Sequence, residues 1–169
     1  GHYAVETINL NDTARQAIKH FQPTPDTLVF DVELASDLMA IRGGPSQLYR
    51  VLVNLLANAM DAMQGVGQLT LRTENFYLDQ SAGRYGHIPK GEYVKLSVTD
   101  TGSGIPHVIL NKVFEPFFTT KTSDRRRGSG LGLSVVHSVV EDHGGYVDFE
   151  SEMGKGTSFF VYLPVSRDS

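Results

Sequence analysis

Apolar and polar residues alternate along the chain with two different periods, which together predict an α/β domain. Seven short segments carry an apolar residue at about every second position, as is typical of half-buried strands. They are AVETINL, TLVFDVEL, DLMAIRG, QLTLRTENFYL, EYVKLSVTD, YVDFESE and GTSFFVYLPV. We expect the second and third segments to form a strand pair, the fourth and fifth to be joined by the hairpin-like loop DQSAGRYGHIPKG, and the last two to form a hairpin around MGKG.

Three further segments have apolar residues at helical spacing. In the first, Asn11 or Asp12 is the expected N-cap, and the motif QPTP ends the helix. The second opens around GGPS, and the third begins at about residue 131 and is closed by two glycines. The three helices are expected to end at about His20, Met63 and His143. This order predicts a two-layer α/β sandwich, in which a mixed sheet of about five strands and a small hairpin pack on about three helices.

Length and composition indicate one domain, since 169 residues with 40% hydrophobic side chains can bury a core. The net charge of −4 argues against nucleic acid as the main partner. The absence of cysteine excludes disulfides and a cysteine nucleophile. No apolar run reaches the roughly 20 residues of a membrane-spanning helix, so direct membrane contact is not expected. The chain begins Gly1-His2 without Met, from which we expect either a tag remnant or a fragment excised from a longer protein.

The second predicted helix carries a polar stripe beside its apolar face. The apolar arc, which is expected to face the sheet, consists of Leu48, Val51, Leu52, Leu55, Leu56, Ala59 and Met63. Asn54, Asn58 and Asp61 follow at i, i+4 and i+7, so they share one stripe. Because asparagine is a mediocre helix former and its amide oxygen can bind a hard cation, the stripe is a candidate Mg²⁺ site. A solvated helix face is the alternative.

Asp100 is a second candidate, because it ends a predicted strand and is followed by Gly102 and Gly104. A carboxylate at the floor of a cleft can accept a hydrogen bond from an exocyclic amine such as that of adenine. Glycines beside it let a flat ring approach the backbone. Ordinary turn chemistry also explains an aspartate followed by glycines.

The third candidate is the stretch DRRRGSGLGL. Gly128, Gly130 and Gly132 precede a predicted helix, so their amides can converge on an anion near the positive end of the helix dipole. Lys121 and the arginines at 125–127 can add positive charge. The alternative is a mobile hinge with solvated basic residues. The stretch matches neither the P-loop nor the dinucleotide-binding fingerprint.

A long irregular segment separates the second and third candidates and contains VFEPFFTTK. Its aromatic residues Phe114, Phe117 and Phe118 stand in otherwise polar surroundings. They can anchor a long loop to the core, or they can form a hinge that docks differently when a ligand binds.

In this order, the motifs resemble those of the catalytic, ATP-binding domain of bacterial sensor histidine kinases, in the GHKL superfamily. NLLANAMDAM resembles the N box, DTGSGIP the G1 box, VFEPFFTTK the F box and GSGLGL the G2 box, and HGGYVDFESEMGKGTSFFVYLP resembles the closing hairpin. Four boxes in the right order and spacing make the resemblance specific, and it covers the chain from about Val5 to Pro164, which it implies to be the core of the domain at about residues 5–164. The F box separates kinases from the topoisomerase, heat-shock chaperone and MutL branches. The resemblance implies a Bergerat-type ATP-binding fold with an ATP lid at about residues 105–129.

The resemblance also implies roles for individual residues. Asp100 would bind the adenine amino group, Asn58 and Asn54 would ligate Mg²⁺ near the triphosphate, and Thr157 would approach adenine from the last hairpin. Phe114, Phe117 and Phe118 would anchor the lid, and Lys121 with one arginine would reach the γ-phosphate. The implied nucleotide-binding residues are Asn54, Asn58, Asp61, Asp100, Gly102, Gly104, Ile105, Phe114, Lys121, Gly128, Ser129, Gly130, Leu131, Gly132 and Thr157.

Three positions depart from the common family pattern. Asp61 stands where many members have a Lys or Arg that meets a phosphate, although kinases with FEPFFTTK often have an acidic residue there. The second helix starts at the sequence Gly43-Gly44-Pro45, where many family members have Gly-Asp-Pro. Ser129 stands where Thr is frequent.

None of the six histidines has the setting of a phosphoacceptor, in which His is followed by Glu or Asp and then Pro. We therefore expect the dimerisation and phosphoacceptor domain to be absent, this chain to be monomeric, and the full-length protein to be a cytoplasmic or membrane-bound homodimer. The expected reaction is in-line transfer of the γ-phosphoryl group of Mg·ATP to a histidine of that domain, with a response regulator receiver downstream. No general base is assigned to this chain.

Two other functions fit parts of the pattern. A degenerate binding module would hold nucleotide and signal by conformation, but intact Asn58, Asp100 and G2 glycines argue against it. An ATPase of the topoisomerase, chaperone or MutL type would carry a catalytic Glu where this chain has Asn54, and asparagine is a poor general base for water.

Overall fold

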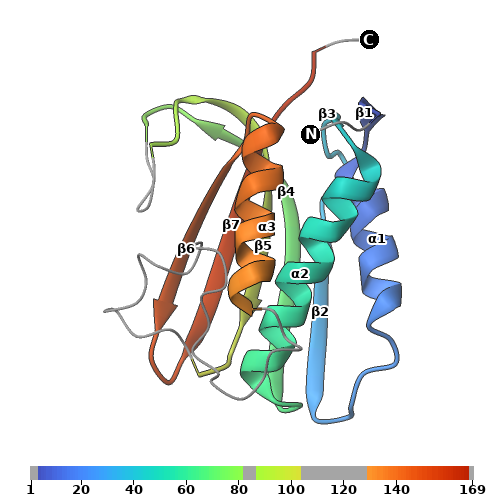
Figure 1. The fold of residues 1–169 in the computed structure, drawn as a ribbon, viewed down its shortest axis with the longest axis vertical. Helices are drawn as coiled ribbons and strands as arrows, with labels where there is room; N and C mark the ends of the chain where they lie inside the picture. The colour runs from blue at the N-terminus through green and yellow to red at the C-terminus, as the bar shows by residue number, and fades with distance from the viewer. Residues whose placement is uncertain (1–3, 82–86, 104–128, 168–169) are drawn as a thin grey trace.

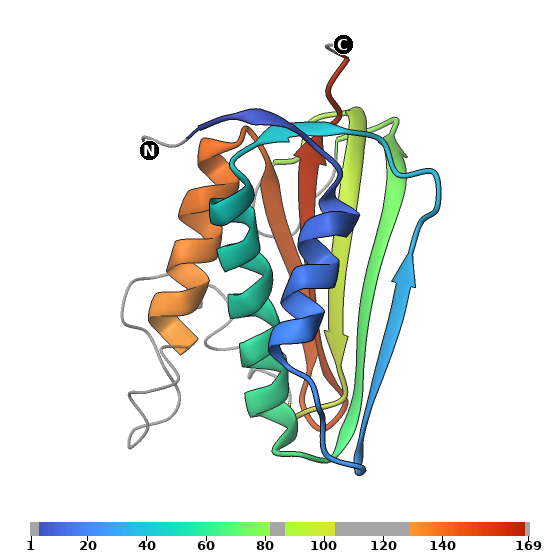
Figure 2. The ribbon, with the colours of Figure 1, turned by 90° about the vertical axis from the view of Figure 1, so that its right-hand side faces the viewer.

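The structure is a computed structural model that describes residues 4–81, 87–103 and 129–167, with only the backbone of residues 129–132. Three helices cover one face of a five-stranded sheet, and a small two-stranded sheet lies at one end (Figure 1, Figure 2). The predicted two-layer α/β sandwich is confirmed. The elements are β1 (Glu6–Ile8), α1 (Leu10–His20), β2 (Leu28–Leu34), β3 (Ile41–Gly43), α2 (Pro45–Met63), β4 (Gly67–Leu78), β5 (Gly91–Asp100), α3 (Ser129–Asp142), β6 (Tyr146–Glu152) and β7 (Gly156–Pro164).

The large sheet is mixed and has the strand order β2-β4-β5-β7-β6. β2 runs parallel to β4, and the other neighbours are antiparallel. The predicted pairing of β4 with β5 and the hairpin of β6 with β7 are confirmed. This order places β5 in the middle of the sheet, so a residue at its end is surrounded by other strands.

The expected pairing of TLVFDVEL with DLMAIRG is wrong. β2 pairs along its whole length with β4, whereas β3 pairs with β1 in the small sheet, where Ile8 lies opposite Ile41. The small sheet is therefore not a hairpin, because α1 and β2 separate its two strands in the chain. The alternating pattern identified both strands correctly but contained no information on their partners.

The core lies between the helices and the covered face of the sheet. All seven residues of the predicted apolar arc of α2 are buried, and α3 adds Leu133, Val136 and Val140. Side chains such as Leu71 and Leu96 meet them from the sheet. Over residues 4–81, 87–103 and 129–167, no helix combines the length and the hydropathy required to cross a bilayer.

The expectation that Asn11 or Asp12 caps α1 is wrong, because the N-cap is Asn9. The Asn9 side chain accepts a hydrogen bond from the amide of Asn11. Asn11 is buried instead, where its amide nitrogen donates to the carbonyl of Ala35 and its oxygen accepts from the Thr73 hydroxyl, both at 2.7 Å. Asn11 therefore ties α1 to β4 and to the segment after β2.

Candidate functional site

Asp100 ends β5, and only 5% of its surface is exposed. Its Oδ1 accepts a hydrogen bond from the amide of Gly102 at 2.8 Å, and the amide of Thr157 also donates to the carboxylate. Burial raises the pKa of Asp100 above its usual value, while the two amides act in the opposite direction. The carboxylate is thus fixed in orientation, and a hydrogen-bond donor presented to it would face an acceptor with little competing water.

The turn after β5 packs against the last turn of α2. A Cβ atom on Gly102 would lie 2.7 Å from both the Cβ and the carbonyl oxygen of Ala62, so only glycine fits here. Thr101 Oγ1 accepts from the amide of Gln68 at 3.0 Å and lies 3.9 Å from the Met63 sulfur. Ala62 is one helical turn beyond Asn58, so the end of β5 and the polar stripe of α2 lie at the same end of the molecule.

The stripe of Asn54, Asn58 and Asp61 is partly exposed along its whole length, directly beside the buried arc of α2. Among the described residues, no group of three or more His, Cys, Asp or Glu is placed to hold a metal ion. Two amide oxygens and a carboxylate are hard donors of the kind that Mg²⁺ prefers, and Mg²⁺ commonly takes its remaining ligands from water and substrate phosphates. The donor chemistry of the stripe therefore fits a magnesium ion shared with a bound phosphate.

The hairpin of β6 and β7 closes the other side of Asp100. Thr157 lies opposite Asp100 on one side and opposite Ser151 on the other, and its hydroxyl oxygen is 2.8 Å from that of Ser151. Gly156 has a φ of 132°, and a Cβ atom on it would lie 2.0 Å from the carbonyl oxygen of Asp100. The hairpin can approach the end of β5 only because this residue lacks a side chain.

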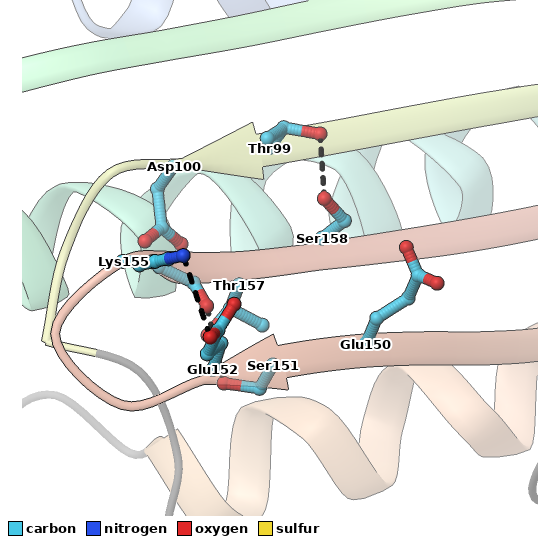
Figure 3. A pocket seen from close by; sticks show the side chains of 9 residues that line it. Thr99, Asp100, Glu150, Ser151, Glu152, Lys155, Thr157 and Ser158 are labelled. Atoms are coloured by element: carbon cyan, nitrogen blue, oxygen red, sulfur yellow. Dashed lines mark hydrogen bonds and ion pairs between the residues drawn. The ribbon is translucent and has the colours of Figure 1, made fainter.

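A polar pocket of about 480 Å³ opens beside this hairpin (Figure 3). Its lining comes from β5, β6, β7 and the turn that joins the last two, and consists of Thr99, Asp100, Glu150, Ser151, Glu152, Lys155, Gly156, Thr157 and Ser158. Lys155 Nζ lies 3.5 Å from Glu152 Oε1, and the hydroxyls of Thr99 and Ser158 are 2.9 Å apart. Figure 3 shows Asp100, Thr157 and Lys155 at one end of these strands, with Glu150 farther along β6. No residue of α2 is among the described lining. Thr99, Ser158 and Glu150 lie side by side on neighbouring strands and alternate with the core residues Val98, Phe159 and Phe149, so the pocket opens mainly on the face of the sheet opposite the helices and does not include the stripe.

Several residues of this region were not predicted from the sequence. They are Ser151, Gly156 and the charged side chains Glu150, Glu152 and Lys155. The predicted hairpin around MGKG contained the relevant signal, since its register places Ser151 opposite Thr157. Nothing in the local sequence distinguishes Gly156 from Gly154, although only a Cβ atom on Gly156 would overlap the end of β5.

The remaining predicted residues belong to the G2 stretch and the lid. The first turn of α3 is formed by Ser129, Gly130, Leu131 and Gly132, so the helix begins two residues earlier than expected. The four amides at the start of a helix have no intrahelical acceptor, and these amides therefore belong to a helix N-terminus instead of the predicted loop nest. The predicted residues that lie outside the described residues are Gly104, Ile105, Phe114, Lys121 and Gly128, together with the rest of the expected lid at 105–128.

Comparison with known proteins agrees with this arrangement. Residues 43–167 match the family described as histidine kinase-, DNA gyrase B-, and HSP90-like ATPase. The sensor kinase CckA of Brucella abortus is 45% identical over 139 residues, which are 79% of this chain and 14% of that protein. The sensor histidine kinase ZraS of Escherichia coli is 32% identical over 167 residues, which are 98% of this chain and 32% of that protein.

Solved structures show the same fold. The catalytic domain of the histidine kinase ThkA superposes with a TM-score of 0.76 at 28% identity, over 96% of both chains. ThkA in complex with the response regulator protein TrrA matches with a TM-score of 0.71 at 26% identity, over 96% of this chain and 42% of that one. The chain spans less than a third of the length of the curated relatives described above. It belongs to the histidine kinase-, DNA gyrase B- and HSP90-like ATPase family, and the kinship with sensor histidine kinases expected from its four boxes is confirmed.

Proposed function

We propose that this chain is the catalytic domain of a sensor histidine kinase and transfers the γ-phosphoryl group of ATP to a histidine on a separate dimerisation domain. The observation that carries the proposal is the buried carboxylate of Asp100, held by the amides of Gly102 and Thr157 beside the end of α2. Membership of the ATPase family and the similarity to CckA and ZraS support the same reading.

Adenine recognition follows from Asp100. The exocyclic amine of adenine is a hydrogen-bond donor, and the ionised carboxylate is an acceptor whose position two backbone amides already fix. Thr157 would contact the same ring edge, directly or through water. Gly102, with Gly104 and Ile105 from the G1 box, would form the wall of the base pocket.

Phosphate binding follows from α2 and α3. Asn58 and Asn54 would hold Mg²⁺ by their amide oxygens, and Asp61 lies on the same stripe. When bound, Mg²⁺ supplies charge neutralisation at the β- and γ-phosphates. The amides of Ser129, Gly130, Leu131 and Gly132 would donate to phosphate oxygens, with Gly128 and the basic side chain of Lys121 nearby in the sequence.

The reaction is an in-line displacement at the γ-phosphorus. A nitrogen of the acceptor imidazole forms the new P–N bond, the bond to the β,γ-bridging oxygen breaks, and ADP leaves with the electron pair. The contribution of this chain is to orient the triphosphate and to place hydrogen-bond donors around it. We assign no general base to the chain, because activation of the imidazole belongs to the acceptor domain.

The partners follow from this role. Residues 1–169 would act as one catalytic domain, with a lid at about 105–129 anchored by Phe114. Its partners would be the dimerisation domain of its own protein and a response regulator, as in the ThkA complex with TrrA. The chain alone would be monomeric and the full-length protein homodimeric. We place the domain in the cytoplasm, where ATP is available.

The test is phosphotransfer in trans. The chain is incubated with γ-labelled ATP, Mg²⁺ and a separately purified dimerisation domain of the ZraS type. We expect label on that domain, stable to base and labile to acid, and no label when its acceptor histidine is replaced by glutamine. At an ATP concentration below saturation, Asp100→Asn should lower transfer about 10- to 100-fold, while Glu33→Gln on the remote strand β2 should not. Steady phosphate release without transfer would instead identify an ATPase, and nucleotide binding without either would identify a binding module.

A further inference from the structure

The N-terminus of α2 and the C-terminus of α3 meet at the end of the molecule opposite the candidate site. The two helices contact each other and run in opposite directions (Figure 1). The end of α3 has a regular stop, in which the amide of Gly145 donates to Val140 and that of Gly144 to Glu141, both at 2.9 Å, and Gly144 has a φ of 71°. His143 is the last residue before this left-handed glycine.

Both ring nitrogens of His143 are engaged. Nδ1 lies 2.8 Å from the carbonyl oxygen of Val139, and Nε2 lies 3.0 Å from the backbone nitrogen of Gly44. A carbonyl oxygen can only accept and a backbone amide can only donate, so the proton must be on Nδ1 and the lone pair on Nε2. The imidazole thus links the last turn of α3 to the N-cap residue of α2.

His143 accepts the hydrogen bond of the N-cap amide of α2, which a side chain of the same helix accepts in a capping box. Gly44 is the N-cap of α2 and has no side chain with which to cap the helix. In a capping box, the residue at N3, here Gln47, would accept a hydrogen bond from the N-cap amide. In this protein the acceptor comes from another helix, 99 residues away in the sequence.

Gly43 provides the space for this contact. A Cβ atom on Gly43 would lie 2.8 Å from Cδ2 of His143 and 2.9 Å from Cδ1 of Leu48. The sequence Gly43-Gly44-Pro45 at the start of α2, which differs from the more common Gly-Asp-Pro, thus leaves room for the imidazole of His143 to pack against Gly43.

The position of this contact sets which residues face each other at the other end of the two helices. Asn58 lies 14 residues beyond Gly44 on α2, and Gly130 lies 13 residues before His143 on α3. At 1.5 Å per residue these separations are about 21 Å and about 20 Å. Because the helices are antiparallel, Asn58 and the first amides of α3 come to the same level.

We infer that His143 is a positioning residue, which fixes the register of α3 against α2 and so sets the spacing between Asn58 and the phosphate-facing amides of α3. This inference rests on the proposed function, because it concerns the phosphate end of the same site. It assigns no role to His143 at the adenine end, where Asp100 belongs to β5.

Two substitutions test the roles of Nδ1 and Nε2 of His143 separately. The side-chain amide nitrogen of Asn can replace Nδ1–H and donate to Val139, but Asn cannot reach Gly44. The oxygen of Gln can replace Nε2 and accept from Gly44. We expect His143→Asn to lower the affinity for Mg·AMPPNP about three- to tenfold while the affinity for adenosine is unchanged, and His143→Gln to stay within about twofold of the parent for both ligands. Gly43→Ala, which displaces the ring from the other side, should reproduce the effect of His143→Asn.

A second measurement does not depend on nucleotide. The chain contains no cysteine, so spin labels can be attached at Arg50→Cys on α2 and Ser138→Cys on α3, both of which are exposed. His143→Asn should shift or broaden the distribution of distances between the labels, and His143→Gln should preserve it. Each variant is first checked for a cooperative thermal transition, and Gly43→Ala takes the place of any variant that fails this check.

The outcomes are distinguishable. Equal losses for AMPPNP and adenosine, an unchanged label distance in His143→Asn, or a changed distance with unchanged AMPPNP affinity would each overturn the inference. If the parent binds neither ligand, the proposed function fails and the positioning role fails with it, even where the label distance still reports a contact between the helices.

Discussion

Thr157 donates a backbone hydrogen bond to the carboxylate of Asp100, its partner across β5 and β7. The two residues are distant in the chain but form one unit, since Gly156 lets the hairpin approach the end of β5 closely. The carboxylate receives its other amide from Gly102, which packs on α2. The orientation of the Asp100 carboxylate therefore depends on contacts from two separate parts of the fold.

Replacement of Asp100 by Asn should weaken nucleotide binding about 10- to 100-fold, because hydrogen bonds to charged groups contribute about 1.5–3 kcal/mol. The asparagine keeps the shape of the side chain but loses the negative charge that attracts the amine of adenine. Calorimetric titration with Mg·AMPPNP measures the effect. Glu33→Gln on β2 removes a carboxylate without touching the site and should bind like the parent. Equal affinity of Asp100→Asn and the parent would exclude Asp100 from adenine recognition.

The raised pKa of Asp100 should appear in the pH dependence of stability. An unfolded chain ionises this group near its usual value of 3.8, whereas the folded protein keeps the proton to higher pH because the group is buried. Between the two pKa values the unfolded state binds fewer protons, so the free energy of unfolding decreases as the pH rises through this window.

Asp100→Asn removes this titration. The free energy of unfolding of the parent minus that of the variant should therefore fall as the pH is raised above 3.8, and it should become constant once Asp100 is ionised. Urea unfolding at closely spaced pH values measures it. A difference that is flat or that rises with pH would show that burial does not dominate the environment of this carboxylate.

Asn58→Ala should separate stability from function. Alanine has a higher helix propensity, so the variant should be more stable by about 0.5 kcal/mol. Mg²⁺ raises the affinity of the parent for AMPPNP, and we expect this increase to be about tenfold smaller in the variant. The affinity for adenosine should be unchanged. Gln47→Ala, three turns earlier on α2, is the matched control. If Asn58→Ala and Gln47→Ala respond alike to Mg²⁺, the stripe is only a solvated face of the helix.

Two glycines of the last hairpin offer an internal comparison. Gly154 has a φ of 81° and open space around it, whereas Gly156 has a φ of 132° and lies against the carbonyl of Asp100. Gly154→Ala should cost about 1 kcal/mol for its backbone conformation alone. Gly156→Ala should cost about 2–4 kcal/mol, because overlap with β5 adds to the strain, and it should also lower nucleotide affinity. Urea unfolding of both variants tests the ranking, and equal costs would contradict it.

A long repeating pattern of apolar residues predicted a helix and its buried face well, but the sequence did not predict which strands pair with each other. The 19 residues of α2 contain enough turns to define the buried arc, and every residue of that arc is buried as expected. The three residues of β3 define a strand but not its neighbour, which is β1 in place of β2. At the start of α1, Asn9, Asn11 and Asp12 are all plausible caps, and only the buried partners of Asn11 decide among them.

The candidate site was predictable by residue type and motif order, but its contacts were not. Asp100, Gly102 and Thr157 were identified by resemblance, whereas the packing of Gly102 on Ala62 depends on how α2 crosses the sheet. His143 attracted no specific role, since its partner Gly44 lies in a different helix and no local pattern encodes such a contact.

The interior position of β7 has a consequence for synthesis of the protein. β7 follows every other strand in the chain, yet it lies between β5 and β6 in the sheet. On the ribosome, β2, β4 and β5 can assemble while the adenine end of the site is still half built, and β5 then presents an unpaired edge to other chains. Nucleotide can stabilise the adenine end of the site only after residues 156–164 have left the exit tunnel, because Thr157 belongs to this last strand.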